Sequence, residues 1–131
     1  MNSHSQTLFD QATEQLRLAQ SALETGQYAE SEKLALQASD TIAASYMTQL
    51  DNEPATPSDE IFEKFATHIW NARTTSDAMK EAWGIVGDVK VLREAHDWSL
   101  PNDISKADAE LTLQRVGEVL KYARCLFPLM D

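Results

Sequence analysis

The segment from Ala19 to Leu50 constrains the fold more than any other, because it reads as the end of one helix, a glycine turn and a complete second helix. Small and apolar residues recur at helical spacing on both sides of Gly26, namely Leu16, Ala19, Leu23, Ala35, Ala38 and Ile42. Glycine commonly ends a helix because it adopts the left-handed conformation without strain. The pattern predicts an antiparallel helix pair over about Ser5–Thr25 and Tyr28–Leu50.

The rest of the chain continues the helical pattern. Few residues favour turns, since the 131 residues include only 4 Gly and 4 Pro, and a hydrophobic content of 43% is enough to fill one core. Further helices are expected from about Ser58 to the polar run at Asn71–Thr75, from Ser76 to about Trp98, and from Ser105 to about Leu126. The expectation is a single all-α domain over residues 1–131, an up-and-down bundle of four to five helices.

Two parts of this pattern carry a family resemblance. The turn formed by Leu23, Gly26, Tyr28 and Ala29 resembles the opening helix pair of the HEPN superfamily, small helical bundles of prokaryotic toxin–antitoxin, defence and mobile-element proteins. The segment from Val116 to Phe127 is similar to the closing helix of that superfamily. A tetratricopeptide hairpin has a closely similar rhythm, but a repeat array needs about three such units and only one is present.

The resemblance raises the question of ribonuclease activity. Catalytic members carry an arginine and a downstream histidine, and the nearest pair here is Arg93 and His96, which stand closer together than the superfamily motif requires. On one helix face this pair could combine a phosphate-binding arginine with a proton-transferring histidine, so a divergent, metal-independent ribonuclease is the alternative function. A histidine near a helix end also has a structural use, since it interacts favourably with the helix dipole.

Other site chemistry is absent from the sequence pattern. Neither His68 nor His96 follows a glutamate at the spacing of di-metal carboxylate bundles, and no phosphate-binding glycine loop is present, so no metal or cofactor is expected. The single cysteine, Cys125, excludes an internal disulfide and fits a reducing compartment. With no targeting sequence and no membrane span in view, a soluble cytoplasmic protein is expected.

Charge and aromatic content point to association rather than catalysis. The net charge of −10, with scattered basic residues, disfavours unaided nucleic-acid binding. The third and fourth helices carry more large apolar side chains than one buried stripe needs, and an interface is predicted at Phe62, Phe65, Trp70 and Trp83. We therefore expect a non-catalytic interaction module that forms a homodimer; the resemblance adds a second protein partner, such as a nucleotidyltransferase or a toxin–antitoxin partner.

Overall fold

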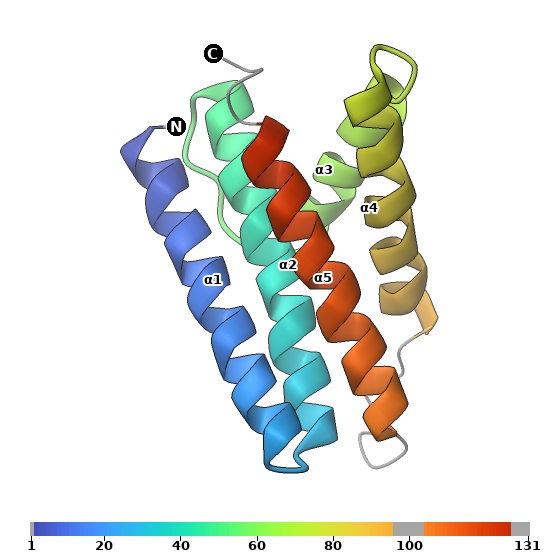
Figure 1. The fold of residues 1–131 in the computed structure, drawn as a ribbon. Helices are drawn as coiled ribbons and strands as arrows, with labels where there is room; N and C mark the ends of the chain where they lie inside the picture. The colour runs from blue at the N-terminus through green and yellow to red at the C-terminus, as the bar shows by residue number, and fades with distance from the viewer. Residues whose placement is uncertain (1, 96–103, 127–131) are drawn as a thin grey trace.

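The computed structural model describes residues 2–95 and 104–126, and it confirms an all-α bundle (Figure 1). Five helices account for 85% of these residues, and no strand occurs among them. The helices are α1 (Ser3–Glu24), α2 (Tyr28–Asp51), α3 (Asp59–Ala72), α4 (Asp77–Ala95) and α5 (Lys106–Leu126). The expected boundaries agree with these within a few residues, although the predicted end of the fourth helix at Trp98 lies outside the described residues.

The predicted α1–α2 hairpin is present, with Gly26 at its turn. Gly26 has a φ of +79°, the left-handed region where glycine avoids the strain that a side chain would add. Short polar side chains join the helices along their length: the Ser31 hydroxyl donates to the Ala19 carbonyl at 2.8 Å, and the Ser5 hydroxyl donates to the Ser45 carbonyl at 2.8 Å. Side chains this short allow the two helix axes to approach closely.

Helix α2 is the centre of the bundle, because α1, α3 and α5 all pack against it (Figure 1). Most residues from Ser31 to Thr48 are buried, and from Thr41 to Thr48 the burial extends to all sides of the helix rather than one stripe. The buried side chains are mainly small, including Ala35, Ala38, Ser39, Thr41, Ala43, Ala44, Ser45 and Thr48. The single core therefore surrounds one helix.

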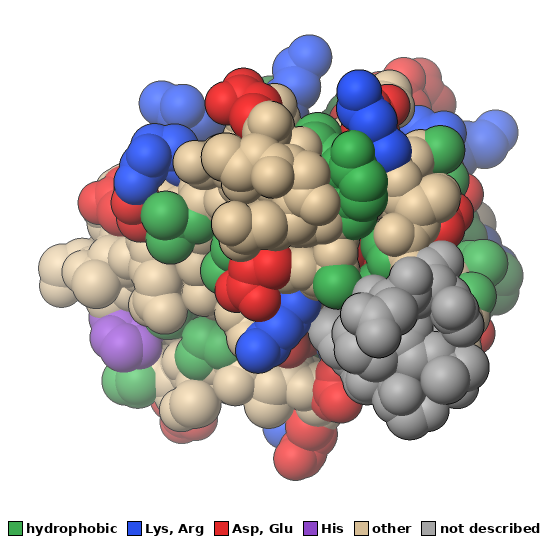
Figure 2. Space-filling view, turned by 90° about the horizontal axis from the view of Figure 1, so that it is seen from below, with side chains coloured by type: hydrophobic (Ala, Val, Ile, Leu, Met, Phe, Trp, Pro, Cys, Tyr) green, Lys and Arg blue, Asp and Glu red, His purple; other side chains and the backbone are tan. Residues whose placement is uncertain are grey.

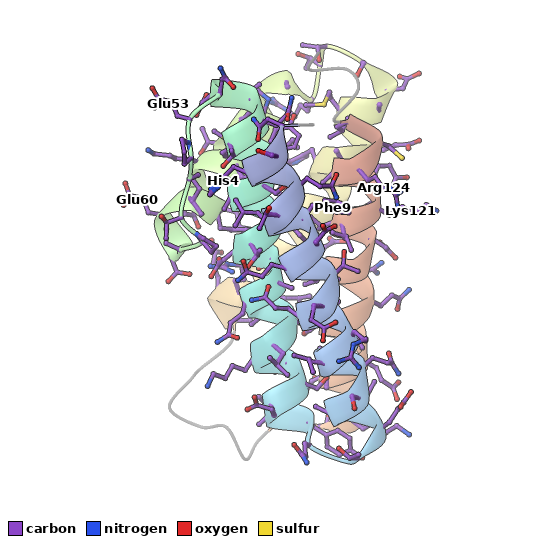
Figure 3. All side chains as sticks on the ribbon, turned by 90° about the vertical axis from the view of Figure 1, so that its left-hand side faces the viewer. His4, Phe9, Glu53, Glu60, Lys121 and Arg124 are labelled. Atoms are coloured by element: carbon purple, nitrogen blue, oxygen red, sulfur yellow. The ribbon has the colours of Figure 1, made fainter. Side chains whose placement is uncertain are left out.

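The order of helix directions departs from strict up-and-down alternation at one connection. Residues 52–58 carry the chain back along α2, so that α3 runs parallel to it. Asp59 at the start of α3 lies beside the middle of α2, because Arg93 binds both Asp59 and Asp40, while Phe65 further along α3 contacts Tyr46 further along α2. Residues 52–58 and α3 therefore lie on the side of the bundle away from the exposed face of α5. In Figure 3, Glu53 and Glu60 project from one side of the bundle, and Lys121 and Arg124 of α5 project from the other.

The α4 helix continues through both of its glycines. Glycine inside a helix favours a kink, yet α4 is helical from Asp77 to Ala95 without interruption at Gly84 or Gly87. Neighbouring helices explain this continuity, since Ala82, Val86 and Val89 of α4 are buried against the bundle and hold the helix in place. Within the described residues, none of the helices combines the length and apolar character needed to cross a membrane.

The close packing around α2 yields a stability prediction. Substituting Ala38→Leu should lower the free energy of unfolding by about 1–3 kcal/mol, because Ala38 is completely buried and the added methyl groups have no free volume to occupy. The matched control is Gln37→Leu at the adjacent exposed position of the same helix, which should change stability little. Urea unfolding followed by far-ultraviolet circular dichroism measures both. Equal stability of the two variants would contradict the central placement of α2.

Candidate functional site

The four predicted interface residues separate into a buried pair and an outer pair. Phe62 and Phe65 are 0% and 1% exposed, so the interface prediction is wrong for both. Both rings belong to the protomer's own core, because α3 turns this face toward α2 and places Phe65 edge-on to Tyr46 with ring centroids 5.1 Å apart. Trp70 remains 43% exposed and Trp83 is half-buried, and these two are available at the outer face of α3 and α4.

The outer pair forms an ordered aromatic surface. The rings of Trp70 and Trp83 meet edge to face with centroids 4.9 Å apart, which joins the end of α3 to α4. The guanidinium of Arg73 lies over the Trp70 ring at 3.2 Å from its centroid and donates a hydrogen bond to the Trp70 carbonyl at 2.6 Å. These contacts hold a large apolar surface in a fixed orientation at the molecular surface.

A hollow of about 560 Å³ lies beside this surface, at the turn between α3 and α4. Its lining comprises Trp70, Arg73, Thr74, Thr75, Ser76, Asp77, Lys80 and Trp83. Within the described chain, neither Arg73 nor Lys80 has a carboxylate partner, so the hollow carries more positive than negative charge in an acidic protein. The arrangement is open, aromatic and cationic, which suits contact with another molecule better than bond-breaking chemistry.

The other predicted site residue, Arg93, lies in a partly buried ion-pair cluster. Its side chain is 13% exposed, contacts the Asp40 carboxylate at 2.8 Å, and also pairs with Asp59. It donates to the Ser39 hydroxyl at 2.8 Å and lies over the Phe62 ring at 4.2 Å from the centroid. The guanidinium thus joins the end of α4 to the middle of α2 and the start of α3.

This cluster has a direct electrostatic signature in Asp40. Burial raises the pKa of the Asp40 carboxyl, and the positive charge of Arg93 opposes that rise, whereas the negative charge of Asp59 adds to it. Asp40 and Asp59 are both negatively charged and come from different helices. The arginine is needed to hold the two carboxylates in proximity because it offsets their repulsion. His96, the predicted partner of Arg93 in catalysis, lies outside the described residues.

The remaining titratable side chains serve packing or lie on the surface. His68 packs beside Tyr46 with ring centroids 5.6 Å apart, and burial lowers the pKa of His68 and raises that of Tyr46 to about 12. Glu32 accepts a buried hydrogen bond from the Thr112 hydroxyl at 2.9 Å, and the Cys125 thiol is exposed near the end of α5. Across the two described ranges, no three His, Cys, Asp or Glu side chains gather in a way that could hold a metal ion.

Comparison with known proteins adds no assignment: no family model, curated protein or solved structure matches this chain. The HEPN resemblance therefore stays a prediction from sequence. Sequence reasoning located Trp70 and Trp83 but missed Arg73, Lys80 and Asp40. Helical spacing could have identified Arg73 and Lys80, since each lies three residues from one of these tryptophans along its own helical segment.

The Arg93 cluster predicts a pH-dependent loss of stability. Arg93→Ala should lower the free energy of unfolding at pH 7 by about 1–3 kcal/mol, between the values for exposed and buried ion pairs, because it leaves Asp40 without its cation. The folded-state pKa of Asp40 is raised, so its charge destabilises the folded protein as the pH rises through that pKa, and removing Arg93 enlarges this effect. The loss should therefore shrink as the pH falls below the pKa of Asp40.

Thermal and urea unfolding at pH 4 and pH 7 measure this difference. Arg17→Ala is the control, because the Arg17–Glu14 pair lies on the exposed face of α1 and should have little effect at either pH. A loss of equal size at both pH values would show that Asp40 is not the group that requires Arg93.

Proposed function

We propose that this protein is a non-catalytic, HEPN-like helical interaction module that acts by association, first with a second copy of itself. The observation that carries the proposal is the ordered apolar surface on the outer face of α3 and α4. Trp70 is 43% exposed there and packs against the half-buried Trp83, and Val91 is 63% exposed further along α4. Exposed aromatic side chains held rigid by their neighbours are typical of the residues that contribute most to binding between proteins.

The proposal extends to partners and cellular setting through the sequence resemblance. A second protein, such as a nucleotidyltransferase or another toxin–antitoxin partner, is the kind of partner that HEPN-like modules imply. A cytoplasmic location is proposed on the single exposed cysteine, which suits a reducing compartment. The net charge of −10 disfavours nucleic acid as the partner.

The arrangement around Arg93 weighs against the alternative ribonuclease. Two carboxylates, Asp40 and Asp59, already neutralise the guanidinium, and a phosphate would have to displace them in a protein with a net charge of −10. Without that displacement, Arg93 lacks the free donors that phosphate binding requires. We therefore assign Arg93 to holding the helices together rather than to binding RNA.

The absence of ribonuclease activity is directly testable. Purified protein should leave single-stranded and structured RNA intact at about 0.1 M salt, a concentration at which long-range repulsion is already screened beyond about 10 Å. His96→Ala should alter thermal stability modestly and change no RNA pattern on a gel. RNA cleavage that disappears in both Arg93→Ala and His96→Ala would overturn the non-catalytic proposal and establish the ribonuclease.

Self-association is the second test. The parent protein should sediment as a dimer at high micromolar concentration, and Trp70→Ala should shift the protein toward monomer, because it removes the most exposed aromatic side chain of the surface. Leu18→Ala is the control, since Leu18 is 41% exposed but lies on α1. Analytical ultracentrifugation gives the dissociation constants. A parent protein that stays monomeric throughout this range would contradict the proposed dimer.

A further inference from the structure

One side of α4 carries a row of partly or fully exposed residues, which we call the α4 ridge. It consists of Lys80, Trp83, Gly87, Val91 and Glu94. The bundle covers the opposite side of the helix, where Ala82, Val86 and Val89 are buried, so the ridge faces away from the core. Val91 is the most exposed of the large apolar side chains in the described chain, at 63%.

The ridge is symmetric about Gly87. Lys80 and Trp83 precede Gly87 by seven and four residues, and Val91 and Glu94 follow it by four and seven residues. Along the helix the order is therefore cation, apolar, glycine, apolar, anion. Residues at these separations lie close to one face of an α-helix.

The glycines of α4 add no side chains to this part of the helix, so its surface lies close to the backbone. A side chain at Gly84 would meet nothing within 4 Å, and one at Gly87 would meet only the Trp83 ring at an ordinary contact distance of 3.6 Å. Packing within the protomer therefore does not require glycine at either position. Each glycine lowers the stability of the helix relative to alanine. The backbone at Gly87 is partly exposed beside the Trp83 ring, and the missing side chain would allow another helix to approach it closely.

We propose that the α4 ridge binds the α4 ridge of a second copy, with the two helices antiparallel and a two-fold axis passing beside Gly87. This deepens the proposed function and rests on it. In a two-fold interface residue i contacts residue j while j contacts i, so Lys80 meets Glu94 of the second copy at both ends, and Trp83 meets Val91. The two backbones cross where both helices carry Gly87.

Charge complementarity selects a second copy in this orientation as the occupant. A parallel arrangement would place Lys80 against Lys80 and Glu94 against Glu94, which is repulsive at both ends. Lys80 has no carboxylate partner within the described chain, and Glu94 is 62% exposed although it accepts a hydrogen bond from Lys90 at 2.7 Å. Lys80 is thus available for contact, and Glu94 would bind it while keeping its exposed contact with Lys90; Trp70 flanks the seam beside Trp83.

The decisive experiment reverses the two charges in separate chains. Lys80→Glu alone and Glu94→Lys alone should each weaken self-association by about tenfold or more, because each homodimer then places like charges together at both ends. An equimolar mixture of the two variants should form a mixed dimer with the affinity of the parental dimer, since both of its charge contacts join opposite charges. Sedimentation equilibrium at about 0.15 M salt measures all three samples.

Cross-linking tests the position of the axis independently. In a Cys125→Ser background, Gly87→Cys should form a disulfide-linked dimer under mild oxidation, because the two substituted positions face each other across the axis. Glu110→Cys in the same background is the control, since this exposed position is on α5 and should give little cross-linking. Circular dichroism of every variant confirms that it is folded.

The outcomes separate this inference from the proposed function. Charge reversals that leave the dimer unchanged, or that weaken it without recovery in the mixture, would overturn the α4 ridge as the interface while leaving self-association in place. A monomeric parent protein would remove both. Recovery of the dimer in the mixture, together with cross-linking at position 87, would establish the antiparallel arrangement.

Discussion

The packing of three helices around the short side chains of α2 is the constraint on which the rest of this structure depends. Alanine, serine and threonine occupy most of the buried positions of that helix, so α1, α3 and α5 reach it from different sides. Its buried hydroxyls do not remain unsatisfied, because they bond to backbone carbonyls such as that of Ala19. The large aromatic side chains are consequently concentrated on α3, where Phe62 and Phe65 fill the space beside Tyr46.

Arg93 supplements this apolar packing at the place where α4 comes closest to the start of α3. The aromatic ring of Phe62 lies under the guanidinium, and carboxylates from α2 and α3 lie around it. A positive charge carried by α4 is therefore enclosed by groups that belong to two other helices, α2 and α3. Glu32 of α2 is also buried, where it accepts a hydrogen bond from Thr112. On the face seen in the end view of Figure 2, acidic and basic side chains are interspersed and hydrophobic side chains form small separate patches.

Local sequence signals predicted the helices well, because they act between residues close in the chain. Gly26 sets the first turn, Ser58 accepts a hydrogen bond from the Ile61 amide at the start of α3, and Ser105 and Asp108 bond each other's backbone amides at the start of α5. The direction of α3 depends instead on the path of residues 52–58, which no periodicity encodes. The same limit explains the site: helical spacing identified Phe62, Phe65, Trp70 and Trp83 as large apolar residues, but only the packing of α3 on α2 decides which of them stay outside.

The central position of α2 also has a consequence for how the chain folds during synthesis. The contacts between α1 and α2 join residues close in sequence, so this hairpin can form early. The side of α2 that receives α5 stays uncovered until Lys106–Leu126 has left the ribosome, since that helix comes last in the chain. One side of the most buried helix of the finished protein is therefore exposed on the nascent chain until α5 has been made. The serine and threonine content of α2 makes that transient surface less prone to aggregation than the surface of a leucine-rich helix would be.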